Sequence, residues 1–259
     1  MTKQISLTIL TKNSSETIEE TLKSTVGFSE VVVLDTGSSD NTLEICRRYP
    51  HVRIFSHDFI GFGPTHNVAS SLTSYDWVLS LDSDEVLTPE LREEILSLSL
   101  DDSTVYRIRR HNFFNGKRIK GCGGWDPDWV TRLYNKRNTS FSQDQVHEKI
   151  LTDNRKTLRL QHAMNHIPYR KISDFLQKMQ TYSTLFAQQN KTHKTSSISK
   201  ALLHGWMAFI KSYFFKRGIF QGSEGLIISL YNGHVTFYKY LKLAETSTAF
   251  SLKRFDGFF

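Results

Sequence analysis

The stretch WVLSLDSDE at residues 77–85 is a short apolar run that ends in three carboxylates within four positions. Such a run is typical of a buried strand in a parallel sheet, and the chain leaves that strand in the crevice where open α/β sheets bind ligands. If the segment stays extended, Asp82 and Asp84 point the same way and can share one hard cation. The stretch therefore predicts a divalent-cation site at the carboxyl edge of a parallel sheet.

The same carboxylates have a simpler explanation, in which they only precede a helix. Thr88 is a good N-cap, Pro89 suits the first helical position, and acids near a helix start are favourable. This explains Glu90 and its neighbours well. It does not explain why carboxylates gather at the very end of a buried strand, so we favour the ligand site.

Composition and charge restrict the class of protein. The 259 residues, 39% hydrophobic and 23% charged, suit one large domain or a domain with an appendage. The two cysteines, Cys46 and Cys122, have neither disulfide nor zinc spacing, which fits a reducing cytoplasm. We expect no signal peptide, and no apolar run reaches the roughly 18 residues that span a bilayer.

Positive charge is concentrated in one segment. Residues 1–168 carry 20 Lys or Arg against 22 Asp or Glu, whereas residues 169–217 carry 9 against 1. This asymmetry predicts an anionic partner for the later segment, either nucleic acid or a lipid surface.

Strand and helix patterns alternate in the first part of the chain. Residues 5–10, 31–34 and 52–55 form β-branched or apolar runs, and helical patterns separate them from one another and from the strand at 77–81. Strands alternating with helices predict an α/β fold with a parallel sheet and right-handed crossovers. From residue 104 onward, residues 104–109 and 129–134 alternate like half-exposed strands.

Polar residues follow three of these strands: Asn13, Asp35, and the pair Asp82 and Asp84. The carboxyl ends of parallel strands meet at one edge, so these side chains should converge on one crevice. Asp35 by itself could equally be a turn-forming carboxylate. The absence of Walker A and GxGxxG patterns disfavours a kinase or a dehydrogenase.

Four motifs, in this order and spacing, resemble those of the family 2 glycosyltransferases: TKN at 11–13, VLDTGSSDNT at 33–42, HN at 66–67 and LDSDE at 81–85. The resemblance covers residues 5–150 and implies a GT-A fold, a Rossmann-like mainly parallel sheet flanked by helices. It implies a UDP-sugar donor bound by Thr11, Asn13, Asp35, His66, Asn67 and Asp82. It also implies a divalent cation, Mg²⁺ or Mn²⁺, on Asp84 with Asp82. Family members often have Arg at the position of His66.

The acceptor side is predicted from residues 121–148. The triplet Val146-His147-Glu148 is similar to one in the subfamily that builds the lipopolysaccharide inner core. By that similarity Glu148 would be the catalytic base and His147 would lie near the metal. Inverting transfer is a direct displacement that needs one carboxylate to take the acceptor proton, while the metal neutralises the departing diphosphate. Asp126 is a second catalytic candidate, with Asp128 and Asp144 as further rivals. Trp125 could stack on an acceptor sugar or simply pack on the core.

The last part of the chain has three helical patterns, at residues 172–186, 202–214 and 226–241, with a linker at 191–197. The second pattern is unusually aromatic and is flanked by Lys200, Lys211, Lys216 and Arg217. Its apolar residues could be the core of a helical appendage. No nucleic-acid recognition motif is present, so we expect no nucleic-acid partner. An apolar face rimmed by basic residues favours an anionic membrane surface.

The sequence therefore predicts a catalytic domain at 1–168 and a basic, aromatic helical region at 169–259 for membrane-surface or acceptor docking. The expected activity is an inverting, metal-dependent transfer of a hexose, glucose from UDP-glucose by resemblance, to an inner-core heptose of lipopolysaccharide. The enzyme would be cytoplasmic and peripheral on the inner face of the plasma membrane. Two alternatives remain: transfer to another lipid-linked or protein acceptor, and a non-catalytic nucleotide- or lipid-binding scaffold on the same fold.

Overall fold

The computed structural model describes residues 4–144 and 148–246, and these form two compact units. The first unit comprises residues 1–111 and 127–167, and the second comprises residues 112–126 and 168–259. The predicted boundary after residue 168 differs from this division by one residue. The segment 112–126, which the sequence placed in the catalytic domain, packs with the second unit instead.

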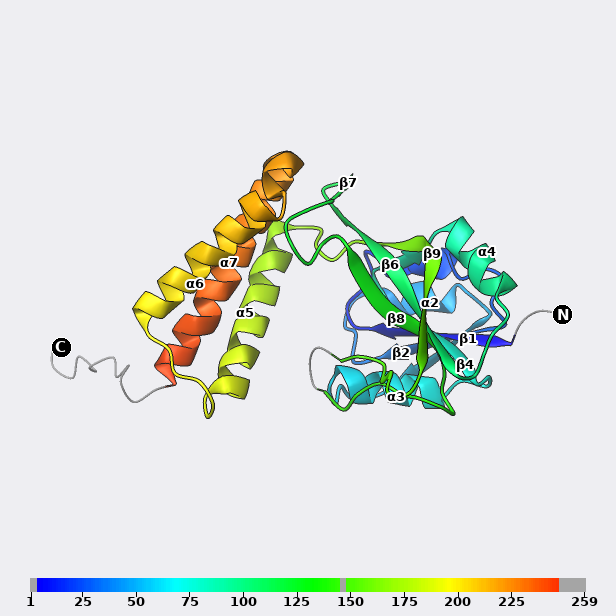
Figure 1. Ribbon diagram of the computed structural model, residues 1–259. Coiled ribbons are helices and arrows are strands. Elements are labelled where there is room, and N and C mark those ends of the chain that lie inside the picture. The colour runs from blue at the N-terminus through cyan, green and yellow to red at the C-terminus, as the bar shows by residue number, and fades with distance from the viewer. Residues whose placement is uncertain (1–3, 145–147, 247–259) are drawn as a thin grey trace. The chain divides into compact units, whose positions relative to one another are not determined.

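The first unit is built on one mixed sheet (Figure 1). Its strands are β1 (Ile5–Thr11), β2 (Glu30–Asp35), β3 (Val52–Ser56), β4 (Trp77–Asp82), β5 (Glu85–Leu87), β6 (Thr104–Phe114), β8 (Asp128–Asn135) and β9 (Lys156–His166). The order is β3-β2-β1-β4-β8-β6-β9-β5. The strands β3, β2, β1 and β4 are parallel, as predicted, whereas β8 pairs antiparallel with β4 and β6, and β5 pairs antiparallel with β9. The sheet as a whole is therefore mixed, and only one half has the predicted parallel pattern.

Helices connect the parallel strands and cover the sheet: α1 (Ile18–Lys23), α2 (Thr42–Arg47), α3 (Phe62–Ser71) and α4 (Pro89–Ser97). Strands β1 and β2 are buried almost throughout; β2 has an apolar centre at residues 31–34, and β1 alternates apolar residues with Ser6 and Thr8. Their side chains pack with Ile18 and Leu22 of α1 and with Leu91 and Ile95 of α4 in the main core. Thr88 caps α4 by accepting a hydrogen bond from the Leu91 amide, and Pro89 is its first residue, as the sequence indicated.

The second unit contains the three predicted helices, α5 (Ile172–Asn190), α6 (Ile198–Ile210) and α7 (Gly222–Glu245). They lie side by side in Figure 1. A π-helical turn, η1 (Lys211–Phe215), and a 3₁₀ turn, η2 (Gly218–Gln221), join α6 to α7. The short strand β7 (Lys117–Arg118) pairs with the last residues of β6. Within the ranges that the structure describes, every helix is too short or too polar to cross a bilayer.

Candidate active site

Three neighbouring strands bring their polar ends to one edge of the sheet. In the parallel register Thr11 of β1 lies opposite Asp35 of β2, and Leu10 lies opposite Asp82 of β4. The ends of β2, β1 and β4 are therefore adjacent, which is the convergence that the sequence predicted. This edge is where an open α/β sheet binds its ligand.

A buried network of charges fixes Asp82 at this edge. The Arg132 guanidinium on β8 donates to Asp82 and to Glu85 Oε1, the latter at 2.5 Å. Glu85 is fully buried and also accepts from Arg110 at 3.1 Å, and Arg110 in turn pairs with Asp128 at 2.8 Å. Burial would raise the pKa of Asp82, but the Arg132 charge outweighs it and holds that pKa well below its usual range. Asp82 is therefore a fixed anion at neutral pH.

Asp84 has a different environment from Asp82. Ser83 and Asp84 form a turn between β4 and β5, so the predicted extended geometry of the two carboxylates is wrong. Residues 85–87 of β5 pair with residues 164–166 of β9, which brings His166 beside this turn. His166 Nε2 lies 3.5 Å from Asp84 Oδ1, and both side chains keep some exposure, 12% and 25%. A carboxylate and an imidazole thus meet at the surface of the sheet edge.

This pair of groups fits a divalent cation. Carboxylate suits Mg²⁺ and Mn²⁺, and imidazole suits several transition metals. Within residues 4–144 and 148–246, no three His, Cys, Asp or Glu side chains form a metal site by themselves. Two protein ligands are nevertheless enough for a cation that takes its remaining ligands from water and from substrate phosphates. His147, predicted to lie near the metal, falls outside the described residues.

Two of the residues predicted to bind base and ribose, Asp35 and Asn13, form hydrogen bonds with the turn after β2. Both carboxylate oxygens of Asp35 accept hydrogen bonds from that turn, from the Gly37 and Ser38 amides at 3.0 Å and from the Ser38 hydroxyl at 2.5 Å. Asn13, with a left-handed φ of 50°, accepts from the Ser39 amide at 2.8 Å. The turn-forming alternative therefore describes Asp35 in this structure. By contrast, the buried Thr11 hydroxyl has no hydrogen-bond partner in the described part of the chain.

His66 and Asn67 on α3 are engaged inside the protein. The buried His66 ring stacks on Phe141, with centroids 4.5 Å apart, and its Nε2 lies 3.8 Å from Asp82 Oδ1. Burial, opposed by the Asp82 charge, lowers the pKa of His66 to about 4, so the imidazole is neutral at pH 7. The Asn67 amide makes two hydrogen bonds with the Phe141 backbone, at 2.9 and 3.0 Å. Their predicted contact with the nucleotide stays a prediction; the observed role is to hold residue 141.

This anchoring determines where Glu148 lies. Gly63 of α3 packs so closely on residues 142–144 that a Cβ would come within 1.9 Å of the Ser142 carbonyl oxygen. The Ser142 amide donates to the Lys149 carbonyl at 2.8 Å, which links the chain on the two sides of residues 145–147. Burial and the Asp82 charge raise the pKa of Glu148, while Arg132 and Arg110 oppose the shift. Glu148 is therefore within electrostatic reach of the carboxylate network.

Trp125 and Asp126 lie in the second unit. Trp125 is buried in its core, stacked on Tyr169 at 5.8 Å, and its carbonyl accepts from Asn112 Nδ2 at 2.6 Å. The prediction that Trp125 binds the acceptor is not supported by this position; the core-packing alternative describes it. Asp126 lies 3.7 Å from the Arg118 guanidinium of the same unit. A catalytic role for Asp126 remains a prediction.

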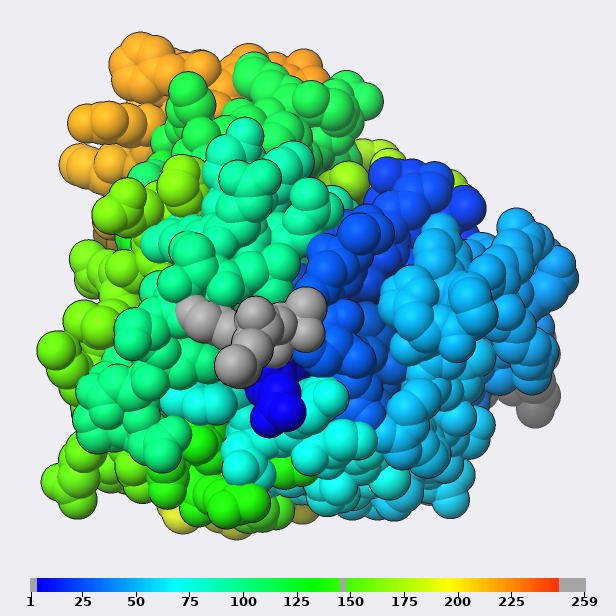
Figure 2. Space-filling model, turned by 90° about the vertical axis from the view of Figure 1, so that its right-hand side faces the viewer, coloured from blue at the N-terminus to red at the C-terminus, as the bar shows by residue number. Residues whose placement is uncertain are grey.

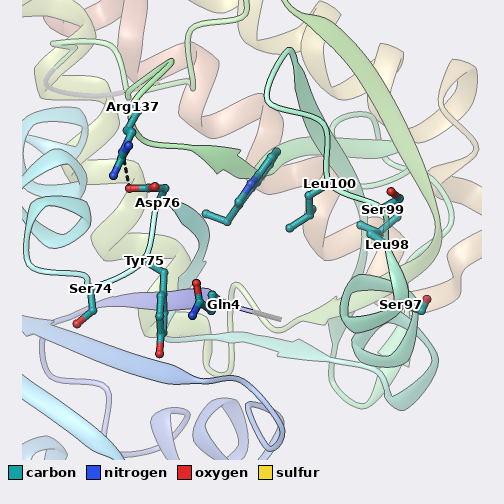
Figure 3. A pocket seen from close by; sticks show the side chains of 10 residues that line it. Gln4, Ser74, Tyr75, Asp76, Ser97, Leu98, Ser99, Leu100 and Arg137 are labelled. Atoms are coloured by element: carbon teal, nitrogen blue, oxygen red, sulfur yellow. Dashed lines mark hydrogen bonds and ion pairs between the residues drawn. The ribbon is translucent and has the colours of Figure 1, made fainter. Parts of the chain in front are cut away.

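An open cavity of about 630 Å³ lies elsewhere in the first unit. It is lined by residues 74–77, by residues 97–100, and by Gln4 and Arg137 (Figure 3). These segments surround the start of β1 (Figure 2) and thus the amino-terminal end of the sheet. Among the described residues that line it, the charged ones are Asp76 and Arg137, which pair with each other at 2.8 Å. This cavity does not include the carboxylates at the carboxyl edge.

Comparison with known proteins identifies the family. Residues 6–153, more than half of the chain, match the sequence profile of glycosyl transferase family 2. The chain is a family 2 glycosyltransferase. An uncharacterized glycosyltransferase of Rickettsia bellii is 28% identical over 95% of this chain and 88% of its own length. The lipopolysaccharide core biosynthesis glycosyltransferase LpsC of Rhizobium meliloti is 24% identical over 96% of this chain and 94% of its own.

Among solved structures, residues 1–349 of S. aureus TarS in complex with UDP-GlcNAc superpose with a TM-score of 0.48 at 16% identity. That alignment covers 94% of this chain and 89% of TarS 1–349. With the family shown, the α/β fold of this glycosyltransferase is the GT-A fold that the resemblance implied.

Three residues that lie at this sheet edge were given no role of their own from the sequence: Glu85, Arg132 and His166. Glu85 was only the third carboxylate after the 77–81 strand, and its side chain is fully buried between two guanidinium groups. Arg132 lies within the strand pattern at 129–134, where an arginine facing the core was a possible signal. His166 ends β9, a strand that the sequence pattern did not indicate.

Proposed function

We propose that this family 2 glycosyltransferase transfers a hexose from a UDP-sugar, with inversion, to an inner-core sugar of lipopolysaccharide such as heptose. The observation that carries the proposal is the carboxylate pair at the sheet edge. There Asp82 is held as an anion by Arg132, and Asp84 meets His166 3.5 Å away. The named relative LpsC, similar over nearly the whole of both chains, supports lipopolysaccharide core as the acceptor class.

In this proposal Asp84 and His166 would hold a divalent cation, Mg²⁺ or Mn²⁺. When bound, the cation would neutralise charge on the departing diphosphate. Asp82, fixed by Arg132, would face the ribose or the metal from the other side of the turn. The buried Thr11 hydroxyl has no hydrogen-bond partner within the described ranges. It would accept a hydrogen bond from the nucleotide or donate one to it.

Glu148 would remove the proton from the acceptor hydroxyl as that oxygen attacks the anomeric carbon. The new bond forms from the acceptor oxygen to this carbon, and the bond to the diphosphate oxygen breaks. The raised pKa of Glu148 suits a base, because it makes the carboxylate a stronger proton acceptor than an exposed glutamate.

The test of the function is product formation. Purified protein is incubated with UDP-glucose, UDP-galactose and UDP-N-acetylglucosamine, each with lipopolysaccharide core acceptors truncated at successive sugars, and products are read by mass spectrometry. We expect a mass increase of one hexose on an acceptor that ends in heptose, and only with Mg²⁺ or Mn²⁺ present. A hexose added only to a different lipid-linked or protein acceptor would correct the acceptor class. Absence of product from every pair would favour the non-catalytic scaffold.

The cation proposal has its own test. We expect Asp84→Asn to weaken Mn²⁺ binding in the presence of UDP by roughly tenfold or more, because even outer partners of a metal ligand contribute that much. Isothermal titration calorimetry measures the affinity directly, without turnover. Asp58→Asn, which removes an exposed carboxylate of the same unit, should leave it unchanged. Equal Mn²⁺ affinity in Asp84→Asn and the parent protein would remove Asp84 from the metal site.

A further inference from the structure

The helix α6 in the second unit has its apolar residues on the outside. Its buried residues are Ala201 and Gly205, and Ser212 continues this row in η1. Four of its large apolar residues are exposed instead: Leu202 by 58%, Leu203 by 61%, Trp206 by 62% and Met207 by 56%, whereas Phe209 and Ile210 are half-buried. A helix of a water-soluble bundle normally has the opposite arrangement, with its large apolar side chains facing the core.

Close packing against α7 explains the small residues on the inner row. A Cβ on Gly205 would lie 2.8 Å from Phe237 Cβ, and a Cβ on Gly233 would lie 3.2 Å from the Gly205 carbonyl oxygen. The Ser212 hydroxyl donates to the Cys122 carbonyl at 2.8 Å, and Asn232 Nδ2 donates to Ser212 Oγ at 3.0 Å. The inner row is thus fully used by small and hydrogen-bonded residues, and nothing in this unit as described covers the outer row. Such small-residue contacts are typical of helices whose outer surroundings are apolar.

The exposed apolar surface continues through the turns η1 and η2. Phe215 and Phe220 are each 77% exposed, Phe214 is 51% exposed and Ile219 is 44% exposed. These turns are well fixed, because the Lys216 carbonyl accepts a hydrogen bond from the Cys122 amide at 2.7 Å and Gly218 packs on the Ser212 carbonyl. The aromatic side chains are therefore held outward by a rigid backbone at the end of the α6–α7 pair where the two turns lie (Figure 1).

The basic residues on this surface indicate which kind of partner it binds. Lys211, Lys216 and Arg217 are exposed among these aromatic residues. Residues 175–223 contain seven Lys or Arg and no Asp or Glu. A second copy of the chain would bring the same positive surface against itself, and like charges oppose such a contact. A surface that is both apolar and negatively charged fits, and a bilayer containing anionic phospholipids has both properties.

We propose that the outer row of α6 and the turns η1 and η2, within residues 198–220, insert into the interface of a bilayer that contains anionic phospholipid. We name this surface the α6–η2 face. Its aromatic and aliphatic side chains enter the headgroup and acyl boundary, and its three cations contact lipid phosphates. The proposal rests on the proposed function for one point: docking would bring the enzyme to a lipid-anchored acceptor. The membrane contact is inferred from the exposed residues alone.

The experiment compares vesicle binding of variants of the full chain. Sedimentation with vesicles of phosphatidylglycerol and phosphatidylcholine, and with phosphatidylcholine alone, gives a partition coefficient for each protein. We expect the double variant Phe215→Ser with Phe220→Ser to bind the anionic vesicles roughly tenfold or more weakly, since both apolar side chains leave the membrane. The matched control is Val26→Ser, which replaces a 60% exposed apolar residue of the first unit and should change nothing.

The charge contribution is tested separately. Lys211→Glu with Lys216→Glu should weaken binding to anionic vesicles severalfold at about 0.1 M salt, and this difference should shrink at about 1 M salt, where the Debye length is about 3 Å. Binding of the parent protein should persist in part at high salt, because apolar insertion is not screened. Unchanged binding in the Phe215 and Phe220 variant would overturn the proposal. Concentration-dependent dimers that the same variant abolishes, without vesicle binding, would assign the face to a second copy.

Failure of the docking and failure of the proposed function can be told apart. If the function is right, the Phe215 and Phe220 variant should still transfer hexose to a delipidated core oligosaccharide while losing activity on vesicle-embedded acceptor. If the parent protein binds vesicles through these residues but forms no product with any donor and acceptor, the docking stands and the proposed function fails.

Discussion

Replacing Arg132 by Met is expected to lower the free energy of unfolding by about 3–5 kcal/mol, the range found when one partner of a buried ion pair is removed. The Arg132 guanidinium contacts Asp82 and the fully buried Glu85, and its side chain is only 6% exposed. Without it, the side-chain partners of Glu85 would be reduced to Arg110, beside the hydrogen bond from the Asp82 amide, and Asp82 would lose its main counter-charge. Urea unfolding at pH 7, with the slope checked for two-state behaviour, measures the difference.

Arg137→Met is the matched control for this prediction. Arg137 follows the same strand and pairs with Asp76 at 2.8 Å, but its side chain is 75% exposed. Exposed pairs contribute about 0–1 kcal/mol, so this variant should unfold close to the parent protein. An equal loss of unfolding free energy in the two variants would show that burial is not the reason for the stabilising effect of Arg132.

The effect of Arg132 should also depend on pH. Arg132 lowers the pKa of Asp82 in the folded state, so in acid the unfolded state takes up the proton first. The stability from this pair is therefore present above the unfolded pKa of about 4 and is lost as pH falls below it. The difference between the parent protein and Arg132→Met should accordingly narrow when unfolding is measured at pH 3 instead of pH 7. A difference that stays constant would mean that the Asp82 carboxylate is not the partner that matters.

The parallel half of the sheet could be predicted because burial on both faces imposes a local rule. Strand β2 has a continuous apolar run at residues 31–34, β1 has apolar residues at Ile5, Leu7, Ile9 and Leu10, and the polar ends of both strands mark the carboxyl edge. Helix α3 shows the limit of such rules. Its buried positions include Thr65, His66 and Ser70, whereas the apolar Val68 is only half-buried. The contacts that bury them, such as the Ser70 hydroxyl with Tyr134, join residues far apart in sequence and leave no local pattern.

The site was predictable only for the residues that end a strand of the parallel half. Asp82 and Asp84 could be found in that way, but their partners Arg132 and His166 come from the antiparallel strands β8 and β9. Spacing two residues apart suggested that the carboxylates point together. The turn at Ser83 and Asp84 instead directs one toward Arg132 and places the other beside His166. Tertiary contact, rather than local periodicity, decides which carboxylate is held by a guanidinium and which lies beside an imidazole.

In the second unit, the spacing of apolar residues predicted the helices, but it did not predict which side of a helix packs against its neighbours. The apolar spacing at 202–214 correctly indicated a helix, but it allowed its apolar residues either to form a core or to face a membrane. Gly205 and Ala201 pack inward instead, because the close approach of α7 leaves no room for larger side chains. A helix with small residues on one side and large apolar residues on the other can turn either side inward. Whether water or lipid surrounds the helix then also determines which side packs inward.

Glu148→Gln is expected to reduce hexose transfer by roughly a hundredfold or more while leaving UDP-sugar binding intact, because the amide cannot accept the acceptor proton. Glu148 is half-buried near the charges of Asp82, Arg132 and Arg110, and its pKa is raised. Transfer by the parent protein should therefore decline on the acid side at a pH above the ordinary glutamate range, since the base is protonated there. Initial rates across pH, with donor affinity from calorimetry, measure both effects.

Asp144→Asn provides the comparison, because Asp144 is an exposed carboxylate on the other side of residues 145–147. The remaining rivals lie beside guanidinium groups: Asp128 pairs with Arg110 at 2.8 Å, and Asp126 lies 3.7 Å from Arg118. If Asp144→Asn loses as much transfer as Glu148→Gln, or if Glu148→Gln keeps the parent rate, then the proton is taken by a different group. The anchoring of residues 141–144 by α3 would then serve that group instead of Glu148.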